Sequence, residues 1–311
     1  MLSPPSSPTT NVEFNTNLAT HSIEDTYQNQ VITFEWNRNG DKIALAKSTS
    51  VIVIQKFDHK TRSFEKFQIL IVGPHPKPTG CLAWDPSHDN KILSIARSNE
   101  IKFWEIYPSS IHTTKLKSVM LEHFVSSNIN DCFNNVKFNK SGDFLAATTT
   151  SDEVFILKKS NFKLVHKFKA SHRIYDFDWN SNGDYIVLAV ESGELQFYNL
   201  MNLKANDPIN EPASAVLKHS LKLSSSRITS VLFTADERYI ISGANDSTVH
   251  IIDPVSLTII KTIKASIDEP VATIDYIEDQ KSQNRFLSVT YEYDAGCYIY
   301  NLNKLLTPKK R

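Results

Sequence analysis

The chain has 311 residues, and its 34 Lys and Arg are balanced by 34 Asp and Glu, so the formal net charge is zero. With 41% hydrophobic and 22% charged residues, its composition is that of a globular protein and excludes a wholly disordered or collagen-like chain. Glycine is scarce, at 8 residues, which disfavours functions that depend on a glycine-rich phosphate loop. The equal charge also argues against a whole-surface electrostatic grip on nucleic acid.

The sequence contains no apolar stretch near the roughly 18 residues that a membrane helix requires, since its longest aliphatic runs are Val51–Ile54 and Ile69–Val72. Residues 1–20 also lack an apolar stretch of the signal-peptide type, so we expect a soluble protein that is not secreted. The cysteines are odd in number and widely spaced, at Cys81, Cys132 and Cys297. This spacing gives neither a disulfide framework nor a C-x-x-C metal pair, and it indicates a reducing compartment.

One unit recurs along almost the whole chain: a short apolar strand that ends in an aromatic residue, a polar turn, a second strand, another polar turn and a third strand. The aromatic residues, which we expect to anchor the units, are Trp36, Trp84, Phe138, Trp179, Phe233 and Tyr276. The five steps between them average 48 residues. WD40 repeats of about 40–45 residues and kelch repeats of about 50 each form one four-stranded propeller blade.

The turns after three of the aromatic residues are near-copies, with the sequences N-R-N-G-D, N-K-S-G-D and N-S-N-G-D over residues 37–41, 139–143 and 180–184. Clusters of Asn, Gly and Asp are typical of tight hairpin turns. Six near-continuous apolar strands follow the aromatics, beginning at Lys42, Lys91, Phe144, Tyr185, Tyr239 and Arg285. Such strands are buried on both faces, as expected between neighbouring blades.

These patterns predict an all-β, WD40-like propeller with six recognisable blades, and no amphipathic helical segments compete with this fold. We expect the blades to begin near residues 31, 79, 133, 173, 227 and 270 within a propeller spanning residues 29–305. Residues 1–28 are rich in Ser, Thr, Pro and Asn and are expected to form a flexible leader. Residues 306–311 are expected to form a basic tail.

The units resemble degenerate WD40 repeats. Trp104-Glu105 stands where a Trp-Asp dipeptide would end the third strand, and Ile252-Asp253 keeps only the acid. The typical bracing network of a WD40 blade joins a His, a Ser or Thr, an Asp and a Trp, and no unit here keeps all four. The remnants that we identify are His172, and Ser242 together with Asp246.

In serial order, the units also resemble the WD40 subunit family of the THO complex, its third subunit. The matching segments begin at Phe34 (F-E-W-N-R-N-G-D-K-I-A-L-A), Leu82 (L-A-W-D-P-S-H-D-N), Ser98 (S-N-E-I-K-F-W-E-I), Gly142 (G-D-F-L-A-A-T-T-T-S-D-E-V-F), Asp176 (D-F-D-W-N-S-N-G-D-Y) and Ile228 (I-T-S-V-L-F). The resemblance covers roughly Val31 to Leu302. It implies a nuclear role that couples transcription to messenger-RNA processing and export within the TREX machinery.

The sequence departs from this family in blade number, because the family's propeller has seven blades and only six units are found here. A β-sheet must pair or protect its edges, so the ring has to be completed or sealed. Four outcomes stay open: six blades, a seventh built partly from Asn11–Gln30, an open ring sealed by a partner, or an incomplete sequence. We expect a missing or incomplete seventh position.

Four acids lie near the ends of predicted inner strands, where they could line the central channel: Glu35, Asp176, Asp178 and Asp275. A ring of carboxylates could hold a cation or perform general acid and base chemistry. The simpler interpretation is that these acids end their strands and pair with bases such as Lys137. The sequence contains no zinc, serine-hydrolase or nucleotide-binding signature, so we predict no catalytic residue, cofactor or bound metal.

The predicted fourth strands, over residues 59–67, 114–118, 161–169, 216–223 and 257–264, carry many Lys and Arg and a single acid. Lysine on an exposed edge strand prevents edge-to-edge aggregation. The densest run interleaves bases with Phe162 and Phe168, a pattern that can track single-stranded RNA. Its bases are candidates for RNA or partner contact: Lys158, Lys159, Lys163, Lys167, Lys169 and Arg173.

These observations predict a non-catalytic WD40 docking subunit of a multi-subunit nuclear complex, THO-like according to the resemblance, with weak or indirect RNA contact and no membrane association. One alternative is an adaptor of another assembly, such as a chromatin-modifying complex. The other is a propeller enzyme with a carboxylate site in the channel. Phe64, Tyr107 and Phe124 are candidates for exposed partner contacts.

Overall fold

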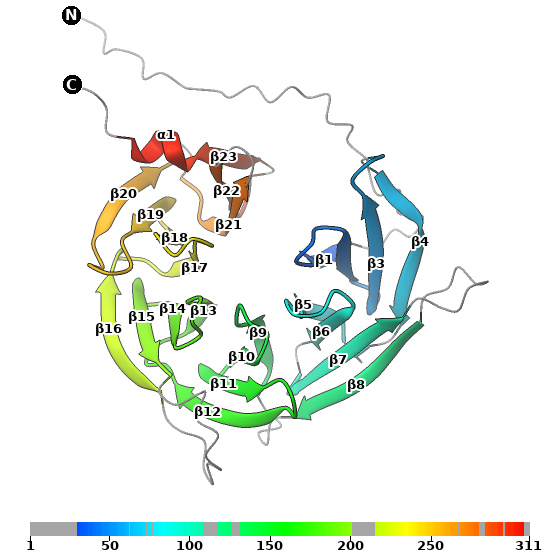
Figure 1. The fold of residues 1–311 in the computed structure, drawn as a ribbon. Coiled ribbons are helices and arrows are strands. Elements are labelled where there is room, and N and C mark those ends of the chain that lie inside the picture. The colour runs from blue at the N-terminus through cyan, green and yellow to red at the C-terminus, as the bar shows by residue number, and fades with distance from the viewer. Residues whose placement is uncertain are drawn as a thin grey trace, which may run out of the picture.

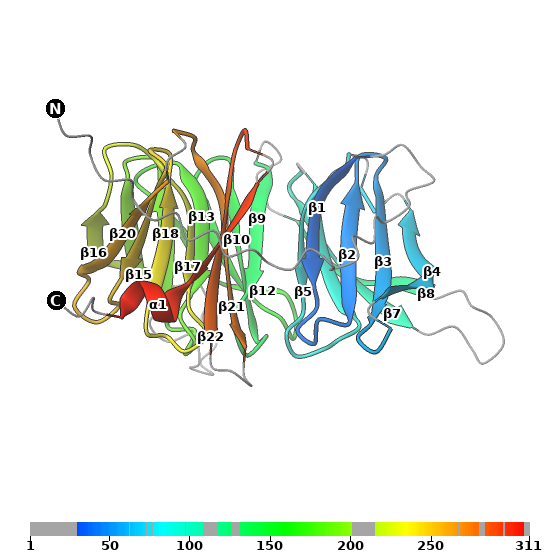
Figure 2. The same cartoon turned by 90° about the horizontal axis from the view of Figure 1, so that it is seen from above.

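The computed structural model describes residues 30–307 except 62, 73, 76, 97, 108–116, 126–130, 201–214, 266–267, 280–283 and 295. Within these residues the chain forms six antiparallel sheets arranged around a central channel, which confirms the predicted propeller (Figure 1). Seen from its edge, the strands of each blade run across the thickness of the disc (Figure 2). Among the described residues, no helix has the length and apolarity to cross a membrane.

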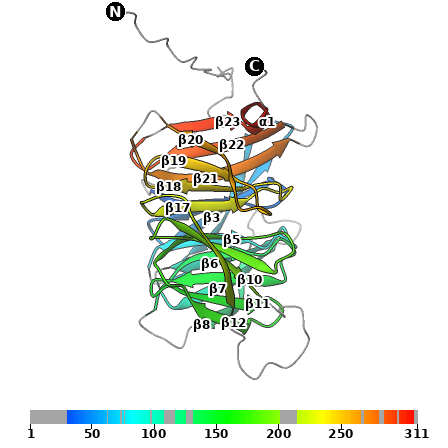
Figure 3. The same ribbon diagram turned by 90° about the vertical axis from the view of Figure 1, so that its left-hand side faces the viewer.

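Five blades have four strands and the sixth has three, each in the order of the chain from the channel outward. Blades 1 to 3 are β1 (Val31–Trp36), β2 (Lys42–Lys47), β3 (Val51–Asp58) and β4 (Ser63–Val72); β5 (Thr79–Trp84), β6 (Lys91–Ala96), β7 (Glu100–Tyr107) and β8 (Lys117–Val125); and β9 (Phe133–Phe138), β10 (Phe144–Thr149), β11 (Glu153–Lys158) and β12 (Lys163–Lys169). Blades 4 to 6 are β13 (Ile174–Trp179), β14 (Tyr185–Val190), β15 (Glu194–Asn199) and β16 (Val216–Lys222); β17 (Ile228–Phe233), β18 (Ile240–Ala244), β19 (Thr248–Ile252) and β20 (Ile259–Lys264); and β21 (Val271–Asp279), β22 (Asn284–Tyr291) and β23 (Cys297–Asn301). A short helix, α1 (Leu302–Leu306), follows β23 and lies beside it (Figure 3).

The three near-identical turns adopt one geometry. In each, the side-chain oxygen of the first Asn accepts the backbone N–H of the residue that opens the second strand: Asn37 from Lys42 at 2.9 Å, Asn139 from Phe144 at 3.0 Å and Asn180 from Tyr185 at 2.9 Å. The Gly of each turn has a positive φ, between 66° and 76°. The repeated sequence therefore fixes the hairpin that joins each inner strand to the second strand.

The hydrophobic core lies between the blades. Five clusters of buried side chains fill the five interfaces from blade 1 to blade 6, because the second strands are apolar on both faces. β10 is buried along its whole length, and β14 along all but its first residue. Each fully buried large aliphatic or aromatic side chain stabilises the fold by about 1.5–3 kcal/mol, so these interfaces dominate the stability.

An inner strand with a blade on each side contacts both neighbours through its last two residues. Side chains alternate across a strand, so the anchor aromatic points back to the preceding blade and the residue before it points forward. The indole nitrogen of Trp84 donates to the carbonyl oxygen of Glu35 in blade 1 at 2.9 Å. Likewise, Trp179 donates to the carbonyl oxygen of Lys137 in blade 3 at 3.1 Å. The aromatic residues thus tie the inner strands of successive blades together.

The outer strands of two blades differ from the sequence prediction. β4 begins at Ser63 and continues to Val72, so the apolar run Ile69–Val72 belongs to the outer strand of blade 1. A bulge between Gln55 and Phe57 on β3 shifts the register of this pair. β8 runs from Lys117 to Val125. Residues 114–116, which we assigned to that strand, lie outside the described residues.

The ring has one open position, between blade 6 and blade 1 (Figure 1). Within the described ranges no strand stands between β23 and β1, and blade 6 has no fourth strand. The face of blade 1 that points away from blade 2, here named the β1 wall, carries the exposed apolar residues Val31, Phe34, Trp36, Leu70 and Val72. The six blades and the missing seventh position agree with the sequence prediction. The predicted leader, residues 1–28, and residues 308–311 of the tail lie outside the described residues.

Gly193, between β14 and β15, occupies a position that excludes a side chain. Its φ is +78°, and a Cβ atom there would lie 2.2 Å from the carbonyl oxygen of Ser224. We expect Gly193→Ala to lower the free energy of unfolding by about 2–4 kcal/mol, because both the backbone and the contact would be strained. Gly80→Ala is the matched control, since no atom lies within 4 Å of its added Cβ. Equal melting temperatures for the two variants would contradict this account.

Candidate functional site

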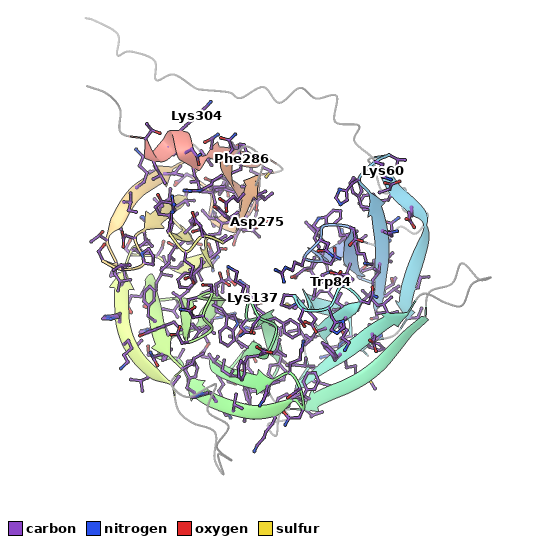
Figure 4. All side chains as sticks on the ribbon, in the orientation of Figure 1. Lys60, Trp84, Lys137, Asp275, Phe286 and Lys304 are labelled. Atoms are coloured by element: carbon purple, nitrogen blue, oxygen red, sulfur yellow. The ribbon has the colours of Figure 1, made fainter. Side chains whose placement is uncertain are left out.

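The central channel gathers charged side chains from the inner strands of several blades. Lys137 of β9 lies among them, with its Nζ 2.9 Å from the Oδ1 of Asp176 on β13. Figure 4 shows Lys137 and Asp275 at the inner edges of their blades, beside the channel. Asn135 of β9 also donates to the Oδ1 of Asp176, at 3.0 Å. The sequence-predicted acids therefore do lie in the inner strands, and one of them pairs with Lys137.

Three of the four channel acids accept hydrogen bonds from the blade that follows their own. Asp178 accepts the backbone N–H of Phe233 at 2.7 Å, and Asp176 accepts that of Val231 at 3.0 Å. Glu35 accepts a backbone hydrogen bond from Trp84 of blade 2. The fourth acid, Asp275, is exposed and accepts a bond from the N–H of its own neighbour Tyr276, at 2.7 Å. The first three acids thus bond successive blades to each other.

The low-dielectric surroundings of the channel shift the pKa values of these groups. Burial raises the pKa of Glu35 to about 7, against the opposing effects of the Lys137 charge and the Trp84 hydrogen bond. Burial likewise raises the pKa of Asp178 to about 6. Burial lowers the pKa of Lys137, but the charges of Asp176 and Asp178 outweigh it and raise that pKa overall. Lys137 is therefore the cation that compensates the channel acids.

The channel acids are engaged in contacts between blades. Among the described residues, no group of three or more His, Cys, Asp or Glu side chains could hold a metal ion. Carboxylate oxygens of Asp176 and Asp178 already accept backbone N–H groups, which occupies part of their coordinating capacity. Cys81 lies near Glu35, and burial raises the pKa of its thiol to about 12, so it is not a thiolate nucleophile. The geometry supports a structural role for these residues.

Blade 2 contains a bracing network that the sequence reasoning missed. The Nε2 of His75 lies 3.0 Å from the Oγ of Ser94, and the indole nitrogen of Trp104 donates to that same oxygen at 2.8 Å. His75 and Ser94 are both buried. His75 lies in the loop before β5, four residues before the strand begins. A His a few residues before the inner strand of a blade is the sequence signal that could have identified it.

The two bracing remnants predicted from the sequence do not form such networks. His172 is exposed and contacts Ser171. The Oγ of Ser242 is buried without a hydrogen-bond partner in the described chain. Asp246 instead accepts from Ser224 at 2.6 Å and from Thr248 at 2.5 Å. The turn acid therefore braces blade 5 through residues that the sequence pattern did not indicate.

The basic residues of blade 3 divide into two groups. Three are engaged: Lys159 pairs with the buried Asp85 of blade 2 at 2.8 Å, Lys167 pairs with Glu153 at 2.9 Å, and Arg173 lies over the ring of Tyr175. The other three, Lys158, Lys163 and Lys169, are exposed and form no ion pair with any described residue.

The two aromatic residues of this run face inward. Phe168 is buried against Tyr198 of blade 4, with ring centroids 4.5 Å apart, and Phe162 packs against Phe103 of blade 2 at 5.4 Å. Neither ring is available as a stacking platform for a base. RNA contact, one of the two roles for which these bases are candidates, would therefore be electrostatic and would use the exposed lysines.

Two grooves open on opposite faces of the disc. One, of about 320 Å³, lies between blades 4 and 5 beside the ends of their inner strands and is lined by Phe197, Phe233 and Val255 among others. The second, of about 480 Å³, lies beside the starts of the inner strands and is lined by Ile32, Pro78 and Phe133 among others. Both are more apolar than polar, so each suits an apolar side chain better than a charged ligand.

The predicted exposed contacts Phe64 and Phe124 are half-buried. Phe64 stacks on Trp36 at 5.9 Å and packs against Phe57 at 5.1 Å. Phe124 packs against Phe133 at 6.1 Å. Both rings are thus partly covered by neighbouring side chains, Phe64 on the β1 wall and Phe124 between blades 2 and 3, and their contact with a partner stays a prediction. The side chain of Tyr107 lies outside the described residues.

Comparison with known proteins agrees with the fold. The family model "WD domain, G-beta repeat" matches residues 215–253, which contain the inner three strands of blade 5. The chain is a WD40-repeat propeller. The model "Anaphase-promoting complex subunit 4 WD40 domain" matches residues 136–215 of this WD40 propeller.

Three relatives share 22% identity with this WD40 propeller. THO complex subunit 3 of Arabidopsis thaliana aligns over 80% of this chain and 71% of its own length. WD repeat-containing protein AAC3 of Dictyostelium discoideum aligns over 73% and 47%, and Protein TEX1 of Saccharomyces cerevisiae over 88% and 62%. The WD40 propeller thus spans less than two thirds of the length of the last two relatives.

The raised pKa of Glu35 makes stability depend on pH. Because the folded state holds the proton up to about pH 7, it binds more protons than the unfolded chain between about pH 4.5 and 7, and stability falls as pH rises through that window. The Gln side chain of Glu35→Gln cannot ionise, so the variant does not lose this stability. The melting temperature of the variant minus that of the wild type should therefore be about 2–4 °C larger at pH 8 than at pH 5. Glu65→Gln, on exposed β4, is the control and should follow the wild type. A Glu35→Gln curve parallel to the wild type would refute the assignment.

The three exposed lysines test RNA contact. If they meet phosphates, the triple variant K158E/K163E/K169E should weaken binding to single-stranded RNA and reduce the slope of log affinity against log salt by about 2. The control K218E/K261E/K264E reverses three exposed lysines on the outer strands of blades 4 and 5. Fluorescence anisotropy over a salt series measures both. Equal slopes for the two variants would show that blade 3 makes no specific RNA contact.

Proposed function

We propose that this WD40 propeller is a non-catalytic docking subunit of a THO-like assembly in the nucleus, where it would couple transcription to messenger-RNA processing and export. The observation that carries the proposal is the alignment with THO complex subunit 3 of Arabidopsis thaliana, which extends over 80% of this chain and 71% of the relative. An alignment over 250 residues is several times longer than one repeat of about 40–50 residues and so is not the product of one generic repeat.

The chemistry of the channel supports the docking part of the proposal. Its acids are used to bond successive blades, and Lys137 compensates their charge. A propeller held in this way is a rigid disc whose two faces and outer rim are available to different partners. The apolar grooves on the opposite faces fit that use, because protein interfaces are centred on desolvated apolar contacts.

A second candidate is an adaptor of another large complex. It is favoured by the match of residues 136–215 to the WD40 domain model of anaphase-promoting complex subunit 4. That match spans blade 3 and most of blade 4. In this case the same propeller would serve as an adaptor in a different assembly, which is the alternative that the sequence left open. The bonding between blades would be the same in both cases.

Purification of the tagged full chain from its native host, followed by mass spectrometry, distinguishes these functions. The proposal expects proteins related to other THO subunits to co-purify in fixed ratio at physiological salt. The destabilised Gly193→Ala variant should lose them, whereas the Gly80→Ala control should retain them. Recovery of the subunits of a chromatin-modifying complex or of an anaphase-promoting complex, or of no stable partner, would overturn the THO assignment.

A further inference from the structure

All six inner strands are distorted at the same position, close to the end of the channel where they begin. In each, the second residue is a β-bulge, because the residues on either side of it pair with consecutive residues of the second strand. The six bulge residues, here named the bulge ring, are Ile32, Gly80, Asn134, Tyr175, Thr229 and Ala272. Bulges are frequent beside functional sites, where they change the direction of a side chain. This end of the channel is therefore a candidate binding surface.

The larger of the two apolar grooves is built on the bulge ring. Its lining includes the bulge residues of three successive blades, Ile32, Gly80 and Asn134, around a volume of about 480 Å³. Ile95 and Phe133 also line the groove and are buried, so they form its floor. Ile32 is 46% exposed at its side. The groove therefore offers an apolar pocket to a side chain that approaches from this end of the channel.

The charge beside the groove is positive. Lys77 is the one charged residue among the described lining residues, and it is exposed and forms no ion pair with any of the described chain. Asp131, two residues before Phe133, is fully buried and is not presented to the groove. An occupant that carries a carboxylate beside its apolar side chain is therefore favoured over one that carries a base.

On blade 4, the bulge residue Tyr175 is accompanied by two further cations. The guanidinium carbon of Arg173 lies 5.5 Å from the centroid of the Tyr175 ring, and that of Arg227 lies 5.1 Å from it. Arg227 also pairs with Glu292 of blade 6 at 3.3 Å, whereas Arg173 is exposed and pairs with no acid that the structure describes. The cation–π contact holds the Arg173 guanidinium beside the ring. The bulge ring thus has an unpaired cation next to it on blade 2 and another on blade 4.

We propose that the bulge ring docks an acidic segment of a partner protein, with one apolar side chain in the groove and carboxylates toward Lys77 and Arg173. This inference rests on the docking role proposed above and adds the chemistry of the partner. Single-stranded RNA fits the ring less well, because it needs exposed aromatic rings for stacking. Phe133, the aromatic residue of the described lining, is buried, and Tyr175 is already in contact with two guanidinium groups.

Panning a phage-displayed library of random dodecapeptides against the purified full chain tests the proposal. The enriched peptides should share a Leu, Ile, Met or Phe flanked by Asp or Glu, and their affinity should fall as the salt concentration rises. Fluorescence anisotropy of the synthesised peptides then measures their affinity for the wild type and for variants of the ring.

Two variants alter the groove without entering the core. Gly80→Trp should fill the groove, since no atom lies within 4 Å of a Cβ added at Gly80, and should weaken peptide binding by at least about tenfold. Lys77→Glu should weaken it by about fivefold or more, because an attraction to the peptide's carboxylates becomes a repulsion. The matched controls are Gly80→Ala, whose methyl group leaves the groove open, and Lys218→Glu, which reverses an exposed lysine on β16. Both controls should bind the peptides as the wild type does.

Three outcomes would overturn the proposal: no enriched peptide, a basic or uncharged consensus, or equal binding by Gly80→Trp and Gly80→Ala at equal melting temperatures. Binding of single-stranded RNA that Gly80→Trp abolishes would also overturn it, because it would assign the bulge ring to RNA. The peptide assay uses the purified chain alone, so its failure is distinct from a failure to recover THO-related subunits. Those subunits could still bind another surface of the propeller.

Discussion

The structure depends on one pair of adjacent residues at the end of each inner strand. Because side chains alternate across a strand, these two residues face opposite neighbours, and a single dipeptide bonds a blade both to the one before it and to the one after it. Asp178 and Trp179 illustrate the two directions, since Asp178 accepts the N–H of Phe233 in blade 5 and Trp179 donates to the carbonyl oxygen of Lys137 in blade 3. The charged channel lining follows from this arrangement in four blades, where the forward-facing residue is Glu35, Lys137, Asp178 or Asp275. In blades 2 and 5 it is the apolar Ala83 or Leu232.

The electrostatics of the channel follow from the bonds between blades. Carboxylates are strong acceptors for backbone N–H groups, and placing them at the interblade positions concentrates negative charge on the axis of the ring. Lys137 offsets that charge from the middle of the chain, where it pairs with Asp176 of the next blade. The zero net charge of the sequence thus arises from opposite charges with fixed places: acids at turns and along the channel, and lysines on the outer strands.

The features that the sequence predicted are those with a local cause. The aromatic anchors, the Asn-Gly-Asp turns and the apolar second strands each follow from a few consecutive residues, and they determine where the inner half of each blade begins and ends. The features that it missed depend on residues far apart in the chain. His75 reaches Ser94 across a loop and a strand, and Phe124 turns inward because Phe133 of the next blade is there to receive it. His75, Ser94 and Trp104 belong to one repeat but are brought together only by its folding, whereas Phe124 and Phe133 belong to different blades.

The open position changes how folding free energy is distributed around the ring. Each blade contacts only its two neighbours, so the total is a sum of blade terms and interface terms, as in a solenoid. The six described blades share five interfaces, and the molecule is thermodynamically a line with two ends. Blades 1 and 6 are those ends and are the units from which opening propagates, while blades 2 to 5 are each held from both sides. Any element that fills the open position adds two interfaces at once. The closed ring then has no terminal blade, so an interface between two blades must open before any blade can unfold.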